Sequence, residues 1–473
     1  MIIGRKKEIK ELWSAYEADN SRFIAVYGRR RVGKTFLVRE VFKNRLTFSY
    51  SGMANVSTKK QLQKFYLTLK HYGFKNGETP SNWITAFDML ERYLESLPKG
   101  KKVVFLDELP WMDAPRSSFL PAFENFWNDW ASARNDILLI VCGSATSWIM
   151  NKILRNRGGL HNRLTDQIHL MPFNLYECEE YSDAYHLPFG RKDILEAYMV
   201  MGGVPFYWSL LQPDLTLTQN IDQLFFGRNP KLKNEFQTLY SSLFKNPEPY
   251  IKLITLLGKK SAGLSRADIL LQTRETTSGT LSRRLEELEE CGFIRRYQTI
   301  GASRKNSVYQ LIDNYTLFYF RFLDGKKITD SNYWQKIQIA LVYHTWCGIA
   351  FERVCLLHSD QIKMALGIGG VISNEYSWRV PAKENSRGAQ IDLLIDRSDH
   401  AINLCEIKYY NGLYAMDQND YDNLMNKLNR FREETRTRSG IALTMITSFG
   451  MVQNKYTSFI NNQITSDALF VNC

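Results

Sequence analysis

The stretch Phe23 to Thr35, FIAVYGRRRVGKT, decides the fold of this chain. It ends in Gly28-x-x-x-x-Gly33-Lys34-Thr35, the phosphate-binding P-loop pattern, and begins with the β-branched and aromatic residues typical of a buried strand. The run FLVREVF that follows predicts a helix whose positive end faces an anion. Strand, loop and helix in this order predict a nucleotide-binding α/β domain with a parallel sheet.

Each residue type in the loop suits phosphate binding. Glycine lets the backbone curl so that successive N–H groups converge on the phosphates. Lys34 supplies a charge for the β- and γ-phosphates, and Thr35 offers a hydroxyl to Mg²⁺. We therefore expect ATP and Mg²⁺ as ligands. The expected binding residues are Gly28, Arg29, Arg30, Arg31, Val32, Gly33, Lys34, Thr35 and Phe36.

The composition is that of a globular chain with several domains. Its 473 residues suggest three units at roughly 150 residues each. Seven scattered cysteines without a C-x-x-C pair indicate neither a zinc ribbon nor a disulfide framework, and they fit a reducing compartment. The start lacks an apolar leader pattern, and the longest apolar run, Ile137 to Cys142, is too short to span a bilayer. We expect a soluble, cytoplasmic protein with no membrane partner.

The charge balance bears on partners. Lys and Arg number 61 against 49 Asp and Glu, which gives a formal net charge of +12. A basic chain favours a polyanion such as DNA as partner, although a basic surface can also serve solubility alone.

The segment Val103 to Glu108, VVFLDE, predicts the second half of the nucleotide site. A buried parallel strand that ends in Asp107 places this carboxylate beside the P-loop, where it can orient hydrated Mg²⁺. Glu108, one residue further, can polarise the water that attacks the γ-phosphate. A pair of acidic residues at any strand end is the alternative interpretation, but the P-loop upstream favours catalysis.

Asp136 to Ser144, DILLIVCGS, predicts another buried strand. The distance from the P-loop leaves room for a strand between the strands that carry the P-loop and Asp107, and Ser144 then stands as a polar sensor of the γ-phosphate. The basic segment Arg155 to Arg163 follows. It is either a solvated loop or the source of an arginine finger, Arg163 before Arg157, acting within one subunit or across a homo-oligomer.

Taken together, these motifs resemble a known family. The GRRRVGKT loop, the FLDELPW and VCGSATSW segments, the GLHNR turn and the Met201-Gly-Gly-Val-Pro205 break are similar to the archaeal-type P-loop ATPases, relatives of AAA+ and signalling ATPases. Ile3-Gly4-Arg5-Lys6-x-Glu8 resembles the short lead-in that lies over the adenine in AAA-type ATPases. The resemblance implies an ATPase core over residues 1–170 and a helical lid over 171–245.

Residues 246–330 predict a winged helix-turn-helix. Two short helices, with Leu281, Leu285 and Leu288 on one face of the second, precede two β-like runs around a basic turn. The second helix carries Arg283 and Arg284 but also four glutamates, so the turn suits phosphate contact better. The basic residues of this turn are Arg295, Arg296, Arg304 and Lys305. DNA binding and docking on the ATPase both remain open for this domain.

Residues 335–473 carry a second constellation. A helix over 340–358 contains Glu352, and two strands carry Asp392 and Glu406-Ile-Lys408. This arrangement resembles the PD-(D/E)xK nucleases, which implies that Asp392 and Glu406 hold Mg²⁺, that Lys408 activates water and that Glu352 reaches the same site. A departure is that Gln390-Ile391 stands where the pattern has proline. Cutting of DNA, binding without cutting, and a scaffold without DNA chemistry are the open alternatives.

The sequence thus predicts an Mg²⁺-dependent ATPase whose nucleotide state controls a winged helix and a restriction-endonuclease-like α/β domain. A switch that binds nucleotide without hydrolysing it is the rival hypothesis.

Overall fold

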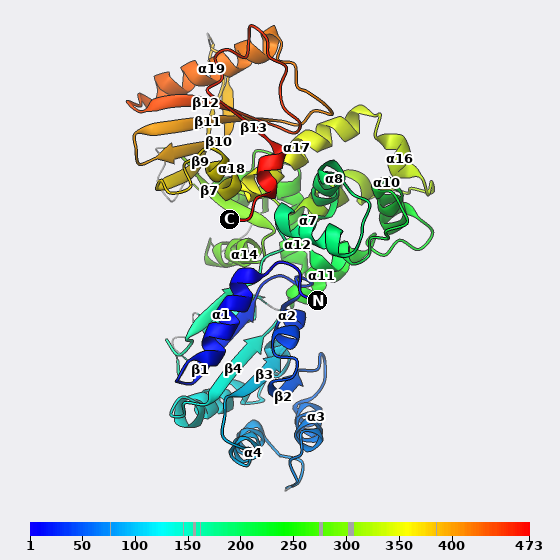
Figure 1. The fold of residues 1–473 in the computed structure, drawn as a ribbon, viewed down its shortest axis with the longest axis vertical. Coiled ribbons are helices and arrows are strands. Elements are labelled where there is room, and N and C mark those ends of the chain that lie inside the picture. The colour runs from blue at the N-terminus through cyan, green and yellow to red at the C-terminus, as the bar shows by residue number, and fades with distance from the viewer. Residues whose placement is uncertain are drawn as a thin grey trace. The chain divides into compact units, whose positions relative to one another are not determined.

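The computed structural model describes residues 1–75, 77–144, 146–154, 158–160, 162–273, 278–300, 307–384 and 386–473. The chain forms two compact units (Figure 1). The first unit holds Met1–Pro172 and Leu239–Pro247, and the second holds Phe173–Thr238 and Glu248–Cys473. In the described parts of the chain, no helix is both long and apolar enough to cross a membrane.

The first unit is built on a five-stranded parallel sheet of order β2-β3-β4-β1-β5. The strand β4 lies between β1, which leads into the P-loop, and β3, which leads into Asp107, as the sequence predicted. The strands are β1 (Arg22–Tyr27), β2 (Leu46–Ser51), β3 (Lys102–Asp107), β4 (Ile137–Cys142) and β5 (Asp166–His169). The main helices are α1 (Lys6–Glu17), α2 (Lys34–Val41), α3 (Thr58–His71), α4 (Trp83–Glu95) and α5 (Phe119–Asn125).

Both faces of this sheet are covered by helices, which explains why its central strands are apolar throughout. Alternate residues of β1 enter two different cores, with Phe23 on one face and Ile24 on the other. Helices α1 and α2 pack on the face of Ile24, while α3, α4 and α5 pack on the face of Phe23 (Figure 1). Because a strand buried on both faces excludes polar side chains, its polar residues gather at the strand ends.

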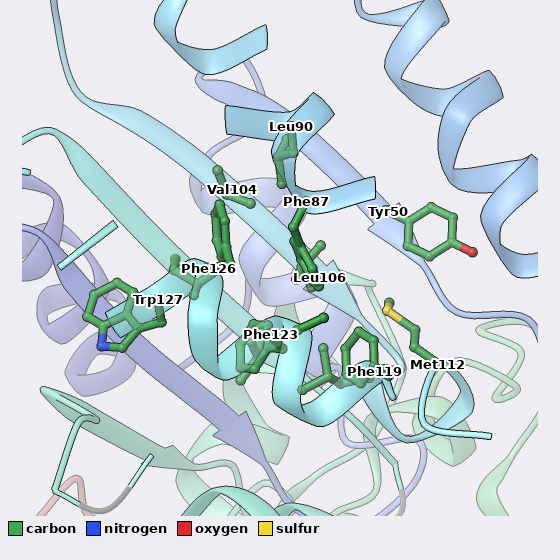
Figure 2. Packing of buried hydrophobic residues seen from close by; sticks show 14 of the residues in the cluster. Tyr50, Phe87, Leu90, Val104, Leu106, Met112, Phe119, Phe123, Phe126 and Trp127 are labelled. Atoms are coloured by element: carbon green, nitrogen blue, oxygen red, sulfur yellow. The ribbon is translucent and has the colours of Figure 1, made fainter. Parts of the chain in front are cut away.

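Figure 2 shows the aromatic part of the core under α4 and α5. The rings of Phe87 and Phe126 stack with centroids 5.0 Å apart, and both belong to the cluster that contains Val104 of β3. At the side of this cluster, the hydroxyl of Tyr50 donates to the side-chain oxygen of Gln61 at 2.7 Å. The core therefore ties β2 and β3 to the helices that cover them.

The second unit begins with helices. Gly203, in the Gly-Gly-Val-Pro segment, lies so close to Phe173 that an added Cβ would be 1.8 Å from the Phe173 carbonyl oxygen. This close approach explains the glycine at that position. The helices between residues 173 and 258 are α7 (Leu175–Ala184), α8 (Arg191–Met201), α9 (Pro205–Trp208), α10 (Leu217–Ile221), α11 (Glu235–Leu243) and α12 (Glu248–Gly258). The part of α11 from Leu239 onward belongs to the first unit.

An eight-stranded mixed sheet, of order β13-β12-β11-β10-β9-β7-β8-β6, runs through the rest of the unit. The strands at one end of this sheet are β6 (Leu264–Ser265), β7 (Ile294–Thr299) and β8 (Val308–Leu311). The helices α13 (Arg266–Thr273) and α14 (Ser278–Glu290) lie between β6 and β7 in the chain. Leu281, Leu285 and Leu288 are all buried, so they share one face of α14. These elements follow the order expected of a winged helix, and the motif itself stays a prediction.

The C-terminal part continues the same sheet, because β7 pairs in parallel with β9. Strands β9, β10 and β11 are antiparallel neighbours, whereas β11, β12 and β13 run parallel. The bounds are α15 (Asn314–Phe318), α16 (Tyr333–Ile337), α17 (Leu341–Leu357), α18 (Ser359–Ala365), β9 (Ser373–Val380), β10 (Ala389–Arg397), β11 (Ala401–Lys408), α19 (Gln418–Thr435), β12 (Gly440–Thr447) and β13 (Asn462–Thr465).

Candidate nucleotide-binding site

The P-loop joins β1 to α2, and two glycines fix its path. Gly28 has φ 136°, and a Cβ there would lie 2.3 Å from the Leu170 carbonyl oxygen. Gly33 has φ 93° and is the N-cap of α2. Glycine is favoured at position 33 by this backbone conformation and not by lack of space, since a Cβ on Gly33 would have no described atom within 4 Å. The loop thus passes close to Leu170, the residue after β5, and leads directly into α2.

Lys34 lies across this loop. Its side-chain nitrogen donates to the carbonyl oxygens of Gly28 and Arg29, at 2.8 Å in each case, and the residue is 6% exposed. The ammonium is therefore held against the loop backbone, where a phosphate would meet it. The remaining expected loop residues differ in burial: Arg29 and Val32 are buried, Arg30 and Arg31 are partly exposed, and Phe36 is exposed.

Thr35 and Asp107 meet across the start of α2 and the end of β3. The Thr35 hydroxyl lies 3.0 and 3.2 Å from the two carboxylate oxygens of Asp107 and donates to this group. Hydroxyl and carboxylate oxygens are the hard donors that Mg²⁺ prefers. The residues present therefore fit a magnesium ion held through Thr35 and Asp107 beside the loop.

Glu108 and Ser144 form a second pair at the same edge of the sheet. Both the backbone N–H and the hydroxyl of Ser144 donate to Oε2 of Glu108, at 3.2 and 2.9 Å. Glu108 itself has φ 48°, a left-handed conformation uncommon outside glycine. The structure thus brings Gly28, Lys34, Thr35, Asp107, Glu108 and Ser144 together at one edge of the sheet, and their roles in binding and catalysis stay predictions.

The sequence also predicted a lead-in segment at the P-loop and an arginine finger. The guanidinium of Arg5, in the lead-in segment, donates to the Val32 carbonyl oxygen at 3.4 Å, so the lead-in touches the P-loop. Arg163 is exposed, ahead of β5, and its role as an arginine finger stays a prediction. The alternative finger, Arg157, lies outside the described residues.

Sequence reasoning missed Ser51, the last residue of β2. Its hydroxyl donates to Oδ2 of Asp107 at 3.3 Å. The available signal was the place of Ser51 at a strand end, because the carboxyl ends of parallel strands meet at one edge of a sheet.

Some charged side chains of the expected winged helix bind to neighbours within the second unit. Arg295 donates to the side-chain oxygen of Gln310 at 2.7 Å and lies 4.5 Å from the ring centre of Tyr297, so it is not a free phosphate contact as expected. Glu287 accepts from the Tyr250 hydroxyl. Of the other turn residues, Arg296 is exposed, while Arg304 and Lys305 lie outside the described part.

The four residues of the nuclease-like constellation divide into two groups. Glu352 in α17 pairs with the buried Arg353. The pKa of Glu352 is raised to about 7, chiefly by burial and also by nearby Asp392, although Arg353 opposes the rise. Asp392 also accepts from the Gln390 side chain at 2.6 Å. Asp392 therefore belongs electrostatically with Glu352.

Glu406 has other partners. Its carboxylate lies 2.6 Å from the ammonium of Lys427 in α19 and 3.4 Å from that of Lys408. We expected Asp392 and Glu406 to converge on one metal ion, and the contacts found do not join them. The pairing of β9 with β10 shifts by one residue between Ile391 and Leu394, and this bulge takes Asp392 out of the alternation that Glu406 follows. In the described residues, no group of three or more metal-ligating His, Cys, Asp or Glu occurs.

Lys427 is the second residue that the sequence did not reveal. It lies 21 positions beyond Glu406 in the amphipathic helix α19. Nothing in a helical lysine distinguishes an exposed position from an ion pair with a neighbouring strand, so no sequence signal was available.

Comparison with known proteins identifies the N-terminal part of the chain. Residues 2–211 match the family described as "ATPase domain predominantly from Archaea". An uncharacterized protein of Methanocaldococcus jannaschii is 24% identical over 361 residues, which covers 75% of this chain and 76% of that protein. An uncharacterized ATP-binding protein of the same organism is 38% identical over 45 residues, 10% of this chain and 76% of that protein.

Among solved structures, the Walker-type ATPase of Pyrococcus abyssi is 17% identical, with a TM-score of 0.48 over 68% of this chain and 96% of that one. Residues 2–211, with their P-loop, Asp107-Glu108 pair and parallel sheet, form an ATPase domain of the family found predominantly in Archaea.

Proposed function

We propose that the first unit binds ATP with Mg²⁺ and hydrolyses it. The observation that carries this proposal is the Glu108–Ser144 pair beside the Thr35–Asp107 pair, because hydrolysis needs a base for water in addition to phosphate-binding groups. Bound Mg²⁺ would neutralise the charge of the phosphate oxygens. Lys34 binds the β- and γ-phosphates, and Thr35 and Asp107 orient the ion.

Glu108 accepts the proton of the attacking water in this scheme. Ser144 holds the Glu108 carboxylate through two donated hydrogen bonds, so it fixes where the base lies. When the γ-phosphate is present, the Ser144 hydroxyl can donate to it instead and release the carboxylate toward water. The exposed Arg163 would stabilise the transition-state charge, from the same subunit or from a second copy.

The test compares nucleotide binding with phosphate release. Glu108→Gln should keep nucleotide affinity and lower the rate of phosphate release by about 100-fold or more, because an amide cannot accept the proton. Lys34→Ala should abolish measurable binding, while Lys43→Ala, an exposed lysine just beyond α2, should leave the affinity within about twofold.

If the wild-type protein binds ATP but releases no phosphate, the chain is a nucleotide switch and the hydrolysis proposal fails. If the Lys34→Ala variant binds ATP as well as wild type, the site itself is wrong.

We also propose that the second unit is a nucleic-acid-binding effector controlled by the nucleotide state. The net charge of +12 and the exposed Arg283 support DNA as partner. The separate partners of Asp392 and Glu406 favour binding over cutting, since a single Mg²⁺ needs its carboxylates together.

A plasmid nicking assay with Mg²⁺ or Mn²⁺ separates the two outcomes. We expect no nicking above the level of Asp392→Ala and Lys408→Ala protein, and Asp399→Ala serves as a charge-matched surface control. Metal-dependent nicking by the wild type that disappears in both site variants, but not in the control, would establish a nuclease instead. Salt-sensitive DNA binding should be present in either case, and its complete absence at low salt leaves a scaffold role.

A further inference from the structure

A cleft of about 650 Å³ lies along β2 in the first unit, and the residues that line it do not include those of the P-loop. Strand β2 is the edge strand of its sheet, with β3 as its neighbour on the other side. Two cationic side chains, Arg39 from α2 and Lys64 from α3, line the cleft together with the imidazole of His71 from α3. Among the described residues that line it, none is acidic. A cleft lined by one sign of charge concentrates the potential and attracts anions.

The other lining groups are mostly hydroxyls. Ser49 lies in β2, Thr68 in α3 and Tyr72 directly after α3. Hydroxyls and cationic side chains are the groups that contact nucleic-acid phosphates most often. The rings of His71 and Tyr72 lie edge to face with centroids 6.0 Å apart, next to the exposed Leu67. Aromatic side chains beside cations offer surfaces on which bases of a single strand can stack.

We propose that this cleft binds the phosphodiester backbone of a nucleic acid, most readily a single strand. An acidic peptide would meet the same cations, but it would leave the rings without a stacking partner. The overall charge of +12 also favours a polyanion over a peptide with a few carboxylates. The ATPase unit would thus contact nucleic acid through its own β2 and α3, independently of the second unit.

The cleft is connected to the nucleotide site by a chain of hydrogen bonds. Arg39 donates to the Ser51 hydroxyl at 3.4 Å, Ser51 donates to Asp107, and Thr35 donates to the same carboxylate. A phosphate that engages Arg39 would draw it away from Ser51 and change what holds Asp107. Bound nucleic acid should therefore alter the rate of phosphate release, a consequence that rests on the ATPase proposal above.

The experiment measures binding of a labelled single-stranded DNA of about 20 nucleotides to the full-length chain, by fluorescence anisotropy without nucleotide and over a range of salt. Lys64→Glu reverses a charge inside the cleft. Lys59→Glu makes the same change near the start of α3, outside the cleft, and is the matched control. Unfolding midpoints of both variants show whether they fold.

We expect Lys64→Glu to weaken binding about tenfold and to reduce the salt slope by about one, whereas Lys59→Glu should stay within about twofold of wild type. Equal losses in both variants would mean diffuse attraction to a basic surface and would overturn the cleft. The proposal would also be overturned if polyglutamate displaced the DNA from the wild-type protein and itself bound less tightly to the Lys64→Glu variant. Because this assay contains no nucleotide, failure of the ATPase proposal leaves its result unaffected. If DNA binds without changing the rate of phosphate release, only the proposed coupling to the nucleotide site is wrong.

Discussion

At the scale of single residues, Glu108, the proposed base, is held in place by its own backbone and by its neighbours. Its φ of 48° costs about 1–3 kcal/mol for a residue other than glycine. The conformation is held by an N–H donated to Oδ1 of Asp107 at 3.0 Å, by the Trp111 N–H donated to the Glu108 carbonyl oxygen, and by Ser144 on the side chain. The backbone strain thus lies in the residue that we propose as the base.

A second residue, His358, should make stability depend on pH. It is fully buried at the end of α17, its Nδ1 bonds to the Val354 carbonyl oxygen, and its Nε2 accepts the N–H of Leu175. Burial lowers the pKa of His358 to about 4, consistent with a neutral ring protonated on Nδ1. The unfolded chain, with an ordinary histidine pKa near 6.5, binds more protons between these two values.

The stability contributed by neutral His358 is therefore present above pH 6.5 and lost as the pH falls toward 4, by about 3 kcal/mol in total. Chemical denaturation of wild type and His358→Gln across this range should show a pH-dependent difference in unfolding free energy. Glu352, whose pKa is raised to about 7, acts with the opposite sign, but it is present in both proteins and cancels in the difference.

His344→Gln is the control, because His344 is an exposed residue of the same helix. An unfolding free energy that differs from wild type by the same amount at every pH would rule out titration of His358.

At the scale of elements, helix α4 has one buried face and one exposed face. Phe87 is 2% exposed and packs in the aromatic core of Figure 2, whereas Ile84, three residues earlier, is 63% exposed. Phe87→Ala should destabilise the first unit by about 3–5 kcal/mol through lost contacts and a cavity. Ile84→Ala should stay within about 0.5 kcal/mol. Thermal unfolding of both variants checks this, and equal midpoints would mean that α4 does not pack as described.

At the scale of the whole molecule, Arg353 ties together distant parts of the second unit. It is 1% exposed, donates to the carbonyl oxygens of Leu311 in β8 and Ser261 before β6, and pairs with Glu352. A buried cation with three acceptors holds α17 against the segment expected to be the winged helix. Movement of either part requires that this network be broken.

Arg353→Met should destabilise the second unit by about 3–5 kcal/mol, because it leaves Glu352 buried without its counter-charge. The double variant with Glu352→Leu should cost less than the sum of the two single variants, measured by urea denaturation. Arg397→Met, which removes a partly exposed pair with Asp399, should cost about 0–1 kcal/mol. Strict additivity of the two buried substitutions would show that the pair does not act as a unit.

The sequence alone determined the features that depend on local pattern. The P-loop, the apolar strand ending in Asp107 and Glu108, and the strand ending near Ser144 are each written in a few consecutive residues. Their meeting could also be predicted, because parallel strands buried on both faces bring their carboxyl ends to one edge. Helix and strand positions in the C-terminal part followed from the same periodicities.

Only the tertiary structure decided which side chains become partners across the sheets. Ser51 reaches Asp107 because β2 pairs with β3, a pairing that no local pattern specifies. Asp392 and Glu406 fit a shared metal site by spacing, yet a one-residue bulge in β10 gives Asp392 the environment of Glu352, while Lys427 takes Glu406. Side chains alternate between the faces of a strand, so a single extra residue changes partners without leaving a mark in the composition of the strand.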